Sequence, residues 1–511
     1  MVEGVTVEIE RRETNFAEFM SRAAEQWPDR PLLVEHDKRS TFAEVQGRVV
    51  AFAGAYRTCG VRPGDRVCIL LPRGDAAIAA FFGALAVGAI GCIVNEGYRS
   101  RQIRVVLADT GAKVIVASDE LWEPLREDPP SRVLRLDPSS IPEPENHHSL
   151  GHSHSVAAQI TYTSGSTGGP KGVLASHANL WAGATVVPNY LGLTPDDRIA
   201  SLLPFSTVYG FSQLTCAIAT GATLVIERST LARDIFAGLD RERVSVVAGV
   251  PSTWMQLIQG GMQETPLRSL RIATCAGGRL APEIVRTLRQ VQTHAEVFLM
   301  YGLTEVFRSA YLRPHEVDVH PDSMGRAVPG AEIFVLRDDG TPCDAGEVGE
   351  LVHRGPTVAM GYWNDSDLTA RVFRTLPIFG AGEGNSERVV YSGDLVKRDE
   401  HGLLYFVGRR DRMIKTLGYR VSPEEVTDVL VASKLTREAA VTSEPDPLRG
   451  ERIVAHVSLR DGASLVDVRR FCGVELPRYM QPTRYELYDT LPRNPAGKVD
   501  MLALRETVGT G

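Results

Sequence analysis

The sequence predicts an α/β protein of more than one domain, and three observations support this prediction. Its 511 residues exceed what a single hydrophobic core usually contains. Helical and strand patterns alternate in two successive blocks, as in parallel sheets that are covered by helices. The chain then becomes rich in strand patterns from Ala331, and a compact α+β tail follows Gly408.

The first block alternates from the start of the chain. Its apolar periodicity predicts helices over 42–56, 76–87 and 99–109, and strands over 65–71, 90–94 and 112–117. The apolar run 76–94 is long enough to cross a membrane, but Gly83, Gly88 and Gly91 interrupt it. We therefore expect a buried helix followed by a strand and no membrane insertion.

The second block and the two regions after it are predicted in the same way. In the second block, strands are expected over 222–226, 244–248, 271–274 and 295–300. The β-rich region is expected to form strands over 332–336, 349–353 and 403–407. The tail should contain helices that begin near Pro423 and Ser464, and strands over 438–442 and 453–459.

Composition narrows the class of protein. Apolar residues make up 43% of the chain and charged residues 23%, which is typical of a globular enzyme. The net charge of −7 argues against a nucleic-acid partner. The seven Cys are scattered without a C-x-x-C pair, and no signal peptide is readable, so we expect a cytoplasmic protein with reduced thiols. A monomer or homodimer is expected.

The segment 163–172 is the most informative stretch. It combines glycines, hydroxyl side chains and one lysine between two apolar runs, as Thr163, Ser164, Gly165, Ser166, Thr167, Gly168, Gly169, Pro170, Lys171 and Gly172. Glycine lets the backbone approach a phosphate, while hydroxyl groups, backbone N–H groups and the lysine bind its oxygens. The pattern differs from a P-loop, in which Gly-Lys-Ser/Thr opens a helix. The sequence predicts a phosphate-binding loop of another kind.

Further motifs follow downstream. Glu305, in the string 301–305 after a strand, is either a first-turn acid of a helix or a Mg²⁺ ligand at the mouth of a parallel sheet. The string 391–395 is typical of a turn, in which Asp394 could accept both hydroxyls of a ribose. The charged string 408–415 suits a hinge or a solvated linker, and the Pro/Gly loop 491–500 offers Lys498.

Together these motifs resemble the adenylate-forming superfamily of acyl-CoA synthetases, nonribosomal peptide adenylation domains and luciferase, and most of all its bacterial stand-alone acyl-CoA ligase-like members. The likeness covers nearly the whole chain, with the motifs in the family's order. It implies a large N-terminal domain over 1–408, made of two α/β subdomains and a small β-barrel-like one. It also implies a small mobile α+β C-terminal domain over 409–511 that turns about Asp411 between two half-reactions.

The resemblance also implies residue roles. The β- and γ-phosphates of ATP would be held by the loop residues Thr163, Ser164, Gly165, Ser166, Thr167, Gly168 and Lys171. The rest of the nucleotide would be bound by Gly277, Gly278, Tyr301 and Gly302 around adenine, by Asp394 and Arg409 at the ribose, and by Thr304 at the α-phosphate. Glu305 would hold Mg²⁺, and Lys498 would bridge the substrate carboxylate and the α-phosphate. Gly418 and Arg420 would approach for transfer to a thiol of CoA or of a carrier protein.

The substrate acid is less well specified. Phe205, Ser206 and Tyr209 lie where the family places its acid pocket, although Phe205 and Tyr209 could equally be core residues. Amino-acid-activating members usually carry Phe-Asp there, so Ser206 favours a small acyl or aryl acid, since a buried ammonium without a carboxylate is costly. Arg308 places a cation near the reacting centre, where it could bind a second anion or be structural. An amine as acceptor, nitrite as the activated acid, and amino-acid loading of a carrier protein remain alternatives.

Overall fold

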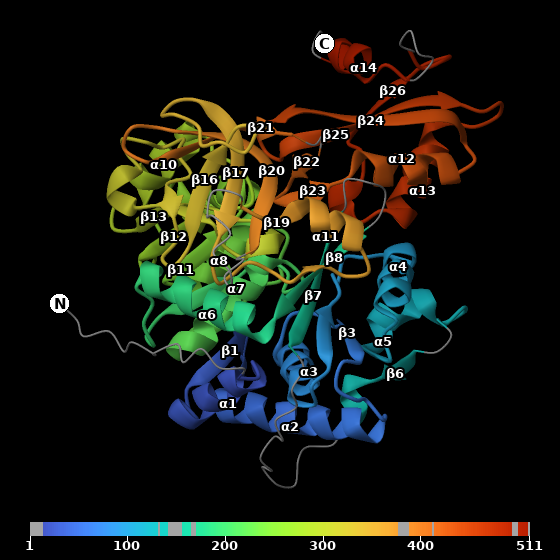
Figure 1. Cartoon of the computed structure of the whole chain (residues 1–511). Coiled ribbons are helices and arrows are strands. Elements are labelled where there is room, and N and C mark those ends of the chain that lie inside the picture. The colour runs from blue at the N-terminus through green and yellow to red at the C-terminus, as the bar shows by residue number, and fades with distance from the viewer. Residues whose placement is uncertain are drawn as a thin grey trace.

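The computed structural model describes residues 14–130, 133–141, 156–164, 170–376, 388–410, 413–492 and 499–508, with the backbone alone at 164, 408, 409, 424, 502 and 506–508. Across these residues the strands form four sheets, and helices are interleaved with them (Figure 1). The predicted α/β fold with a large N-terminal part and a small C-terminal part is confirmed by this architecture.

The first block folds into a seven-stranded sheet of order β18-β8-β7-β4-β3-β5-β6. Its strands are β3 (Arg66–Leu70), β4 (Ile90–Ile93), β5 (Val114–Ala117), β6 (Leu134–Leu136), β7 (Ala157–Ser164), β8 (Pro170–Ser176) and β18 (Gly361–Tyr362). Its helices are α2 (Phe42–Thr58), α3 (Asp75–Ala86), α4 (Ser100–Thr110) and α5 (Asp119–Trp122). Strands β3 to β7 pair in parallel, whereas β7 and β8 form an antiparallel hairpin.

The second block forms a nine-stranded sheet of order β15-β14-β13-β12-β11-β9-β10-β1-β2. Its strands are β1 (Pro31–Glu35), β2 (Lys38–Thr41), β9 (Arg198–Ser201), β10 (Thr223–Ile226), β11 (Val246–Gly249), β12 (Ile272–Cys275), β13 (Glu296–Tyr301), β14 (Ala310–Leu312) and β15 (Arg326–Ala327). Its helices are α1 (Ala17–Gln26), α6 (His177–Leu191), α7 (Val208–Thr220), α8 (Ala232–Arg241), α9 (Pro251–Leu257) and α10 (Pro282–Val291). The hairpin β1–β2 precedes the first block in the chain but pairs here, which sequence alternation did not predict.

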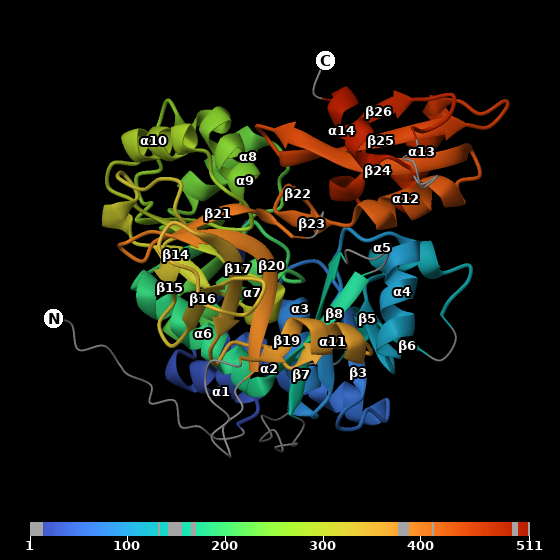
Figure 2. The same ribbon diagram turned by 45° about the horizontal axis from the view of Figure 1, so that its top comes forward.

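The third sheet is antiparallel. It contains β16 (Glu332–Leu336), β17 (Val348–Arg354), β19 (Phe373–Thr375), β20 (Arg388–Arg398) and β21 (Leu404–Arg409), beside helix α11 (Ser366–Val372). The fourth sheet contains β22 (Ile414–Thr416), β23 (Tyr419–Val421), β24 (Thr436–Asp446), β25 (Gly450–Leu459) and β26 (Arg484–Leu487), with α12 (Pro423–Ala432), α13 (Leu465–Glu475) and α14 (Met501–Val508). We call residues 413–508 the tail. In both ribbon views β22 and β23 are the tail strands nearest the other sheets (Figure 2).

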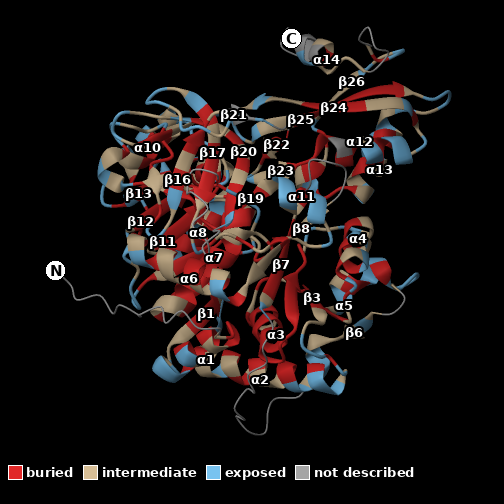
Figure 3. Cartoon of the chain, viewed as in Figure 1, coloured by how far each residue is buried: buried red, intermediate tan, exposed pale blue. Residues whose placement is uncertain are grey.

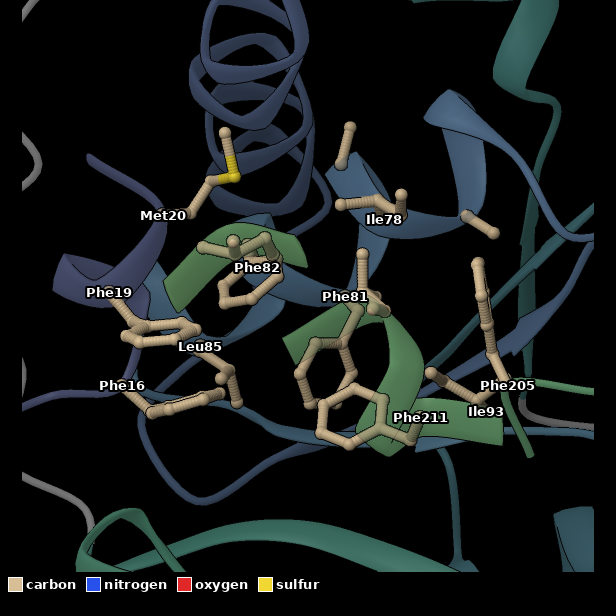
Figure 4. Close-up of a cluster of buried hydrophobic side chains, with 14 of the residues drawn as sticks. Phe16, Phe19, Met20, Ile78, Phe81, Phe82, Leu85, Ile93, Phe205 and Phe211 are labelled. Atoms are coloured by element: carbon tan, nitrogen blue, oxygen red, sulfur yellow. The ribbon is translucent and has the colours of Figure 1, made fainter. Parts of the chain in front are cut away.

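The main core lies between the helices of the first two sheets. Helix α3 is buried over almost its whole length, as predicted for the run 76–94 (Figure 3). Phe81 of α3 meets Phe211 of α7 with ring centroids 5.2 Å apart, so aromatic packing joins the two blocks (Figure 4). Among the described residues, no helix is both long and apolar enough to span a bilayer.

Candidate active site

A cavity of about 700 Å³ opens where the first two sheets, β20 and the tail meet. Segments that follow the parallel strands β12 and β13 line it, and so does the β22–β23 hairpin of the tail. Ligands of open α/β sheets collect at the carboxyl ends of parallel strands, which is where this cavity lies. Of the predicted site residues, the cavity is lined by Thr163, Ser206, Tyr209, Gly277, Gly278, Tyr301, Gly302, Thr304, Asp394, Gly418 and Arg420.

The predicted phosphate loop joins β7 to β8. Thr163 lies opposite Lys171 in the antiparallel register, so both flanks of the loop are held at one point. Gly165, Ser166, Thr167 and Gly168 lie outside the described residues, as does the side chain of Ser164. A second, smaller cavity of about 370 Å³ is lined by Thr163, Lys171 and Glu305. Arg371, Arg374 and Arg410 also line it, and so does Glu350, with which Arg410 forms an ion pair.

Glu305 lies in the short 3₁₀ helix Thr304–Val306 that follows β13. Its side chain is buried; Oε1 accepts a 2.6 Å hydrogen bond from the Tyr362 hydroxyl, whereas Oε2 has no hydrogen-bond partner. Within the described part of the chain, no cluster of three or more His, Cys, Asp or Glu side chains could hold a metal ion. A single oriented carboxylate with one open oxygen therefore fits Mg²⁺, which is usually bound by one or two carboxylates and the phosphates of its substrate.

Asp394 is fully buried and accepts a hydrogen bond from the Tyr301 hydroxyl. The sequence suggested a turn at 391–395, but these residues lie inside the long strand β20. A register shift between Leu395 and Val396 interrupts its pairing with β21, and Gly393 has φ of +68°. The irregularity, and not a turn, thus brings Asp394 beside the cavity. Its partner Tyr301 ends β13, so two sheets contribute to this contact.

Two glycines allow the tail to approach. Gly277 has φ of +80° and Gly418 has φ of +81°, a region that residues with a Cβ rarely adopt. A Cβ at Gly418 would come within 2.4 Å of Val250 Cγ1, and a Cβ at Gly277 would lie 3.5 Å from the Gly418 carbonyl oxygen. The β22–β23 hairpin therefore contacts the cavity through its backbone. Arg420 follows on β23 and faces inward, with Nη2 4.0 Å from Asp394 Oδ2.

Three further predicted residues, besides those of the phosphate loop, cannot be placed in the site. Lys498 and Asp411 lie outside the described residues, as does the side chain of Arg409. The residues that flank the Lys498 loop are described: Leu491 and Val499 pack with Ala440 of β24 in a separate small cluster. These flanking residues are not among those that line the cavity.

The structure places the predicted acid-pocket residues in two different surroundings. Ser206 and Tyr209 line the cavity, and the Tyr209 hydroxyl lies 2.7 Å from Thr274 Oγ1. Phe205 takes the other placement that the sequence left open, because its ring packs in the main core beside α3 (Figure 4) and is not among the residues that line the cavity. Phe205 and Ser206 form the turn before α7, so these neighbouring side chains point to different sides.

One contributor was not identified from the sequence, and a second was noted there without a definite role. Tyr362, which orients Glu305, lies in the short strand β18, and no local pattern around it points to that role. Arg308 lines the cavity with its guanidinium carbon 4.8 Å from the Tyr209 ring centroid. Its position just past Glu305 indicated a nearby cation, but only the fold shows how deeply it is buried.

Known proteins resemble this chain over most of its length. The family model described as AMP-binding enzyme matches residues 20–363, and the model described as AMP-binding enzyme C-terminal domain matches residues 425–498. Sulfoacetate–CoA ligase of Cupriavidus necator is 29% identical over 96% of this chain and 97% of its own length. Malpibaldin synthetase of Mortierella alpina is 32% identical over 94% of this chain, which spans only 9% of that relative.

Solved structures show the same architecture. A variant of o-succinylbenzoate CoA synthetase from Bacillus subtilis superimposes with a TM-score of 0.84 at 25% identity, covering 96% of this chain and 98% of the other. An amide bond synthetase from Marinactinospora thermotolerans gives a TM-score of 0.84 at 25% identity, covering 96% and 99%. Both likenesses extend through the tail.

Proposed function

The chain belongs to the AMP-binding enzyme family, and on that premise we propose that it is an AMP-forming acid–thiol ligase. It activates a small acyl or aryl carboxylic acid with ATP as an acyl-AMP and releases pyrophosphate. It then transfers the acyl group to a thiol, either of CoA or of a carrier-protein phosphopantetheine. A large N-terminal domain over 1–408 and a small mobile C-terminal domain over 409–511, with Asp411 as the hinge, are part of this proposal. The tail described above lies within the second domain.

One observation carries the proposal. Glu305, Asp394 and Arg420 come from three different sheets or their connections, yet Arg420 lies 4.0 Å from each of the two carboxylates. Asp394 and Arg420 line the larger cavity together with the glycines 277 and 278 and the end of the phosphate loop at Thr163. Glu305 lines the smaller cavity, to which Arg420 and Thr163 also contribute. A nucleotide site that is contacted by a separate small region is what a two-step ligase requires. Activation is an attack of the carboxylate on the α-phosphorus and transfer is an attack of the thiol on the acyl carbon, so the two steps need different groups around one bound substrate.

Activation brings two negatively charged groups together, the substrate carboxylate and the α-phosphate. Thr304 and the loop flanked by Thr163 and Lys171 would orient the phosphates, and Lys498 would neutralise the attacking carboxylate. Fixed positive charge of this kind lowers the barrier where charge develops. Glu305 would hold Mg²⁺, which when bound neutralises phosphate charge and orients the leaving pyrophosphate. Tyr301 and Asp394 would bind the adenosine.

Transfer follows with the tail in the arrangement described here. Gly418 lets the β22–β23 hairpin lie against Val250 and Gly277, and Arg420 brings positive charge to the vacated side of the site. Tyr98, Tyr419 and Tyr479 line the same cavity, with the rings of Tyr419 and Tyr479 stacked 3.7 Å apart. An aromatic passage between the tail and the large region suits the narrow pantetheine arm of either acceptor.

The acid pocket favours an acid without a free ammonium group. Ser206 supplies no carboxylate, and the cation of Arg308 lies beside Tyr209 in the same pocket. A buried cation destabilises a second cation nearby. Amino-acid loading of a carrier protein is therefore the weaker alternative. The similarity to sulfoacetate–CoA ligase supports a small acid as the substrate and CoA as the acceptor of its acyl group.

The test is ATP–pyrophosphate exchange with a panel of aryl acids, aliphatic acids, amino acids and nitrite, followed by addition of CoA, a carrier protein or an aryl amine. Exchange with a carboxylic acid and thioester formation would support the proposal. Exchange with amino acids alone would overturn the interpretation of Ser206. Absence of exchange with every acid at saturating Mg²⁺ would overturn the proposal as a whole.

An amine acceptor is the second candidate, and the likeness to an amide bond synthetase over 96% of this chain favours it. The activation step is the same, so exchange cannot separate the two. Product analysis does: an amide without added thiol would identify the amine as acceptor. Nitrite as the activated acid would be recognised by exchange with nitrite and with none of the carboxylic acids.

The cytoplasmic location stays part of the proposal. All seven cysteines are free thiols, which favours a reducing compartment.

A further inference from the structure

Arg308 is a buried cation for which the described residues provide no anion. Its relative exposure is 2%, and its Nε and Nη2 atoms are buried without a hydrogen-bond partner. The ion pairs between described residues include none to Arg308, and those of Glu305 and Asp394 go to Arg420. An arginine stays protonated even when buried, so this charge cannot be removed by loss of a proton. Leaving a buried charge unpaired is costly, which makes the arrangement unusual for a purely structural side chain.

The surroundings of Arg308 are aromatic and neutral. Its guanidinium carbon lies 4.8 Å from the ring centroid of Tyr209. Its charge also acts on Tyr190 and Cys216, and burial raises the pKa of both groups although the arginine opposes this rise. These side chains are therefore neutral at ordinary pH. Contact with an aromatic ring offsets part of the cost of the buried charge but leaves the N–H groups without an acceptor.

The backbone holds Arg308 in place at the cost of strain. Phe307 has φ of +59° and ψ of −65°, and the Arg308 N–H donates to the Val306 carbonyl at 2.6 Å. This is a γ-turn of the rare, strained kind, and bulky residues seldom adopt it. Strain of this type persists where the surrounding structure over-determines it, and it is concentrated at ligand sites.

Two glycines make room for this turn. A Cβ at Gly183 of α6 would come within 2.7 Å of the Phe307 ring, and a Cβ at Gly302 would lie 3.0 Å from the Phe307 carbonyl oxygen. The Phe307 ring is thus clamped against α6 on one side while Arg308 lines the cavity on the other. Ser206, whose Oγ is also buried without a partner, lines the same cavity.

We propose that Arg308 binds a second anionic group of the acid substrate, a carboxylate or sulfonate other than the carboxylate that is activated. This inference rests on the proposed function, because it names the class of acid as a dianion. The bound group would complete the hydrogen bonds that Nε and Nη2 lack, and the Ser206 hydroxyl could donate to it. Specificity would arise because a substrate without this group leaves the buried guanidinium unpaired.

The test compares diacids with their half-amides, which have nearly the same shape but one charge fewer. Succinate with succinamate, and phthalate with phthalamate, form matched pairs for ATP–pyrophosphate exchange. For at least one pair we expect kcat/KM to be lower by about 30-fold or more with the half-amide than with the diacid. A loss of this size is expected when one partner of a buried charge pair is removed. Arg308→Gln should abolish this preference, and Arg308→Lys should retain part of it. Arg286→Gln, at an exposed position on α10, is the control and should keep it.

The variants need a readout of folding and of binding. Thermal unfolding, with and without the diacid, should show stabilisation of the wild type by the diacid and none of Arg308→Gln, while AMP still stabilises both. A variant that fails to bind AMP is replaced in the comparison by Arg308→Lys.

Five results would overturn the inference, three of them directly. The first is exchange that is equal for diacids and half-amides. The second is an Arg308→Gln variant that loses both substrates of a pair equally, since the arginine would then act on the activated carboxylate or on the shape of the pocket. The third is exchange with nitrite alone. Exchange with simple monoacids would leave the proposed function intact and would contradict only the inference that the substrate is a dianion. Absence of exchange with any acid would contradict both this inference and the proposed function.

Discussion

Arg420 Nη1 lies 4.0 Å from Glu305 Oε2, the carboxylate oxygen that has no hydrogen-bond partner. The guanidinium of the tail therefore faces the oxygen that we propose for Mg²⁺. A cation and a guanidinium at one carboxylate repel each other, so we propose that the tail withdraws Arg420 while Mg²⁺ and pyrophosphate are bound. The arrangement described here accordingly suits the second half-reaction, after pyrophosphate has left.

Lys498→Ala should abolish adenylation and spare transfer. Removal of a positive charge from the site of attack is expected to slow exchange by roughly 10²–10³-fold. The residues that flank the Lys498 loop are not among those that line the cavity in the arrangement that we assign to transfer. Rates of exchange and of thioester formation from a supplied acyl-AMP are the two measurements. Equal loss of both would contradict the assignment.

Gly418→Ala should impair transfer more than adenylation. The added Cβ would meet Val250 Cγ1 at 2.4 Å and push the β22–β23 hairpin away from the cavity. Thioester formation from supplied acyl-AMP measures the effect, and Gly418→Ala combined with Val250→Ala should recover part of the rate. Gly462→Ala is a matched control, since it has φ of +79° and no atom within 4 Å of the new Cβ. If both glycine variants behaved alike, backbone strain and not the contact would be responsible.

Glu305→Gln should weaken the dependence of activation on Mg²⁺. The amide oxygen can still accept the hydrogen bond of Tyr362, so the side chain keeps its place but loses its charge. We expect exchange to fall by roughly 10²–10³-fold, and half-saturation to require more Mg²⁺. The measurement is exchange against Mg²⁺ concentration, with Glu296→Gln at the exposed start of β13 as the control. An unchanged Mg²⁺ curve would remove Glu305 from the metal site.

Docking of the tail should weaken as pH rises. Burial raises the pKa of Glu425 on α12 from its ordinary value of 4.5 to about 7; Arg101 of α4 opposes the rise and Asp428 adds to it. The buried carboxyl also faces Tyr98 and Tyr479, which are neutral. Below pH 4.5 the carboxyl of Glu425 is protonated whether or not the tail is docked, so docking costs nothing there. Between pH 4.5 and about 7 docking becomes progressively less favourable, because the carboxyl must stay protonated in the docked arrangement, and above about pH 7 the cost is constant.

Energy transfer between a fluorophore on the large region and one on the tail would follow this change. The docked fraction should fall across the window from pH 4.5 to 7 in the wild type and stay level in Glu425→Gln. Asp461→Asn, an exposed change on the tail, should leave the profile unaltered. A profile that Glu425→Gln did not flatten would assign the pH dependence to another group.

Much of the fold could be predicted because it depends on neighbours in the chain. The apolar run 76–94 became α3 and β4, since its glycine interruptions and its position between strand patterns are local features. The pairing of β1 with β10 could not be predicted, because it depends on contacts between segments far apart in sequence. For the same reason the string at Asp394 was expected to be a turn, although it lies in a long strand with an irregular register.

The acid pocket shows the same division. Phe205 and Tyr209 are both aromatic and lie only four positions apart, and sequence alone offered no reason to separate them. The first packs in the core and the second lines the cavity, because the chain turns into α7 between them.

By itself, the sequence determined the α/β class, the order of the motifs and their resemblance to adenylate-forming enzymes. These features follow from residue types and their spacing, which do not depend on how the chain folds. Only the tertiary structure decided that Arg420 of the tail faces Glu305, and that Arg308 is buried without a counter-charge among the described residues. Burial and pairing of charges are set by packing between distant elements, and the free energy of a charge depends on what surrounds it.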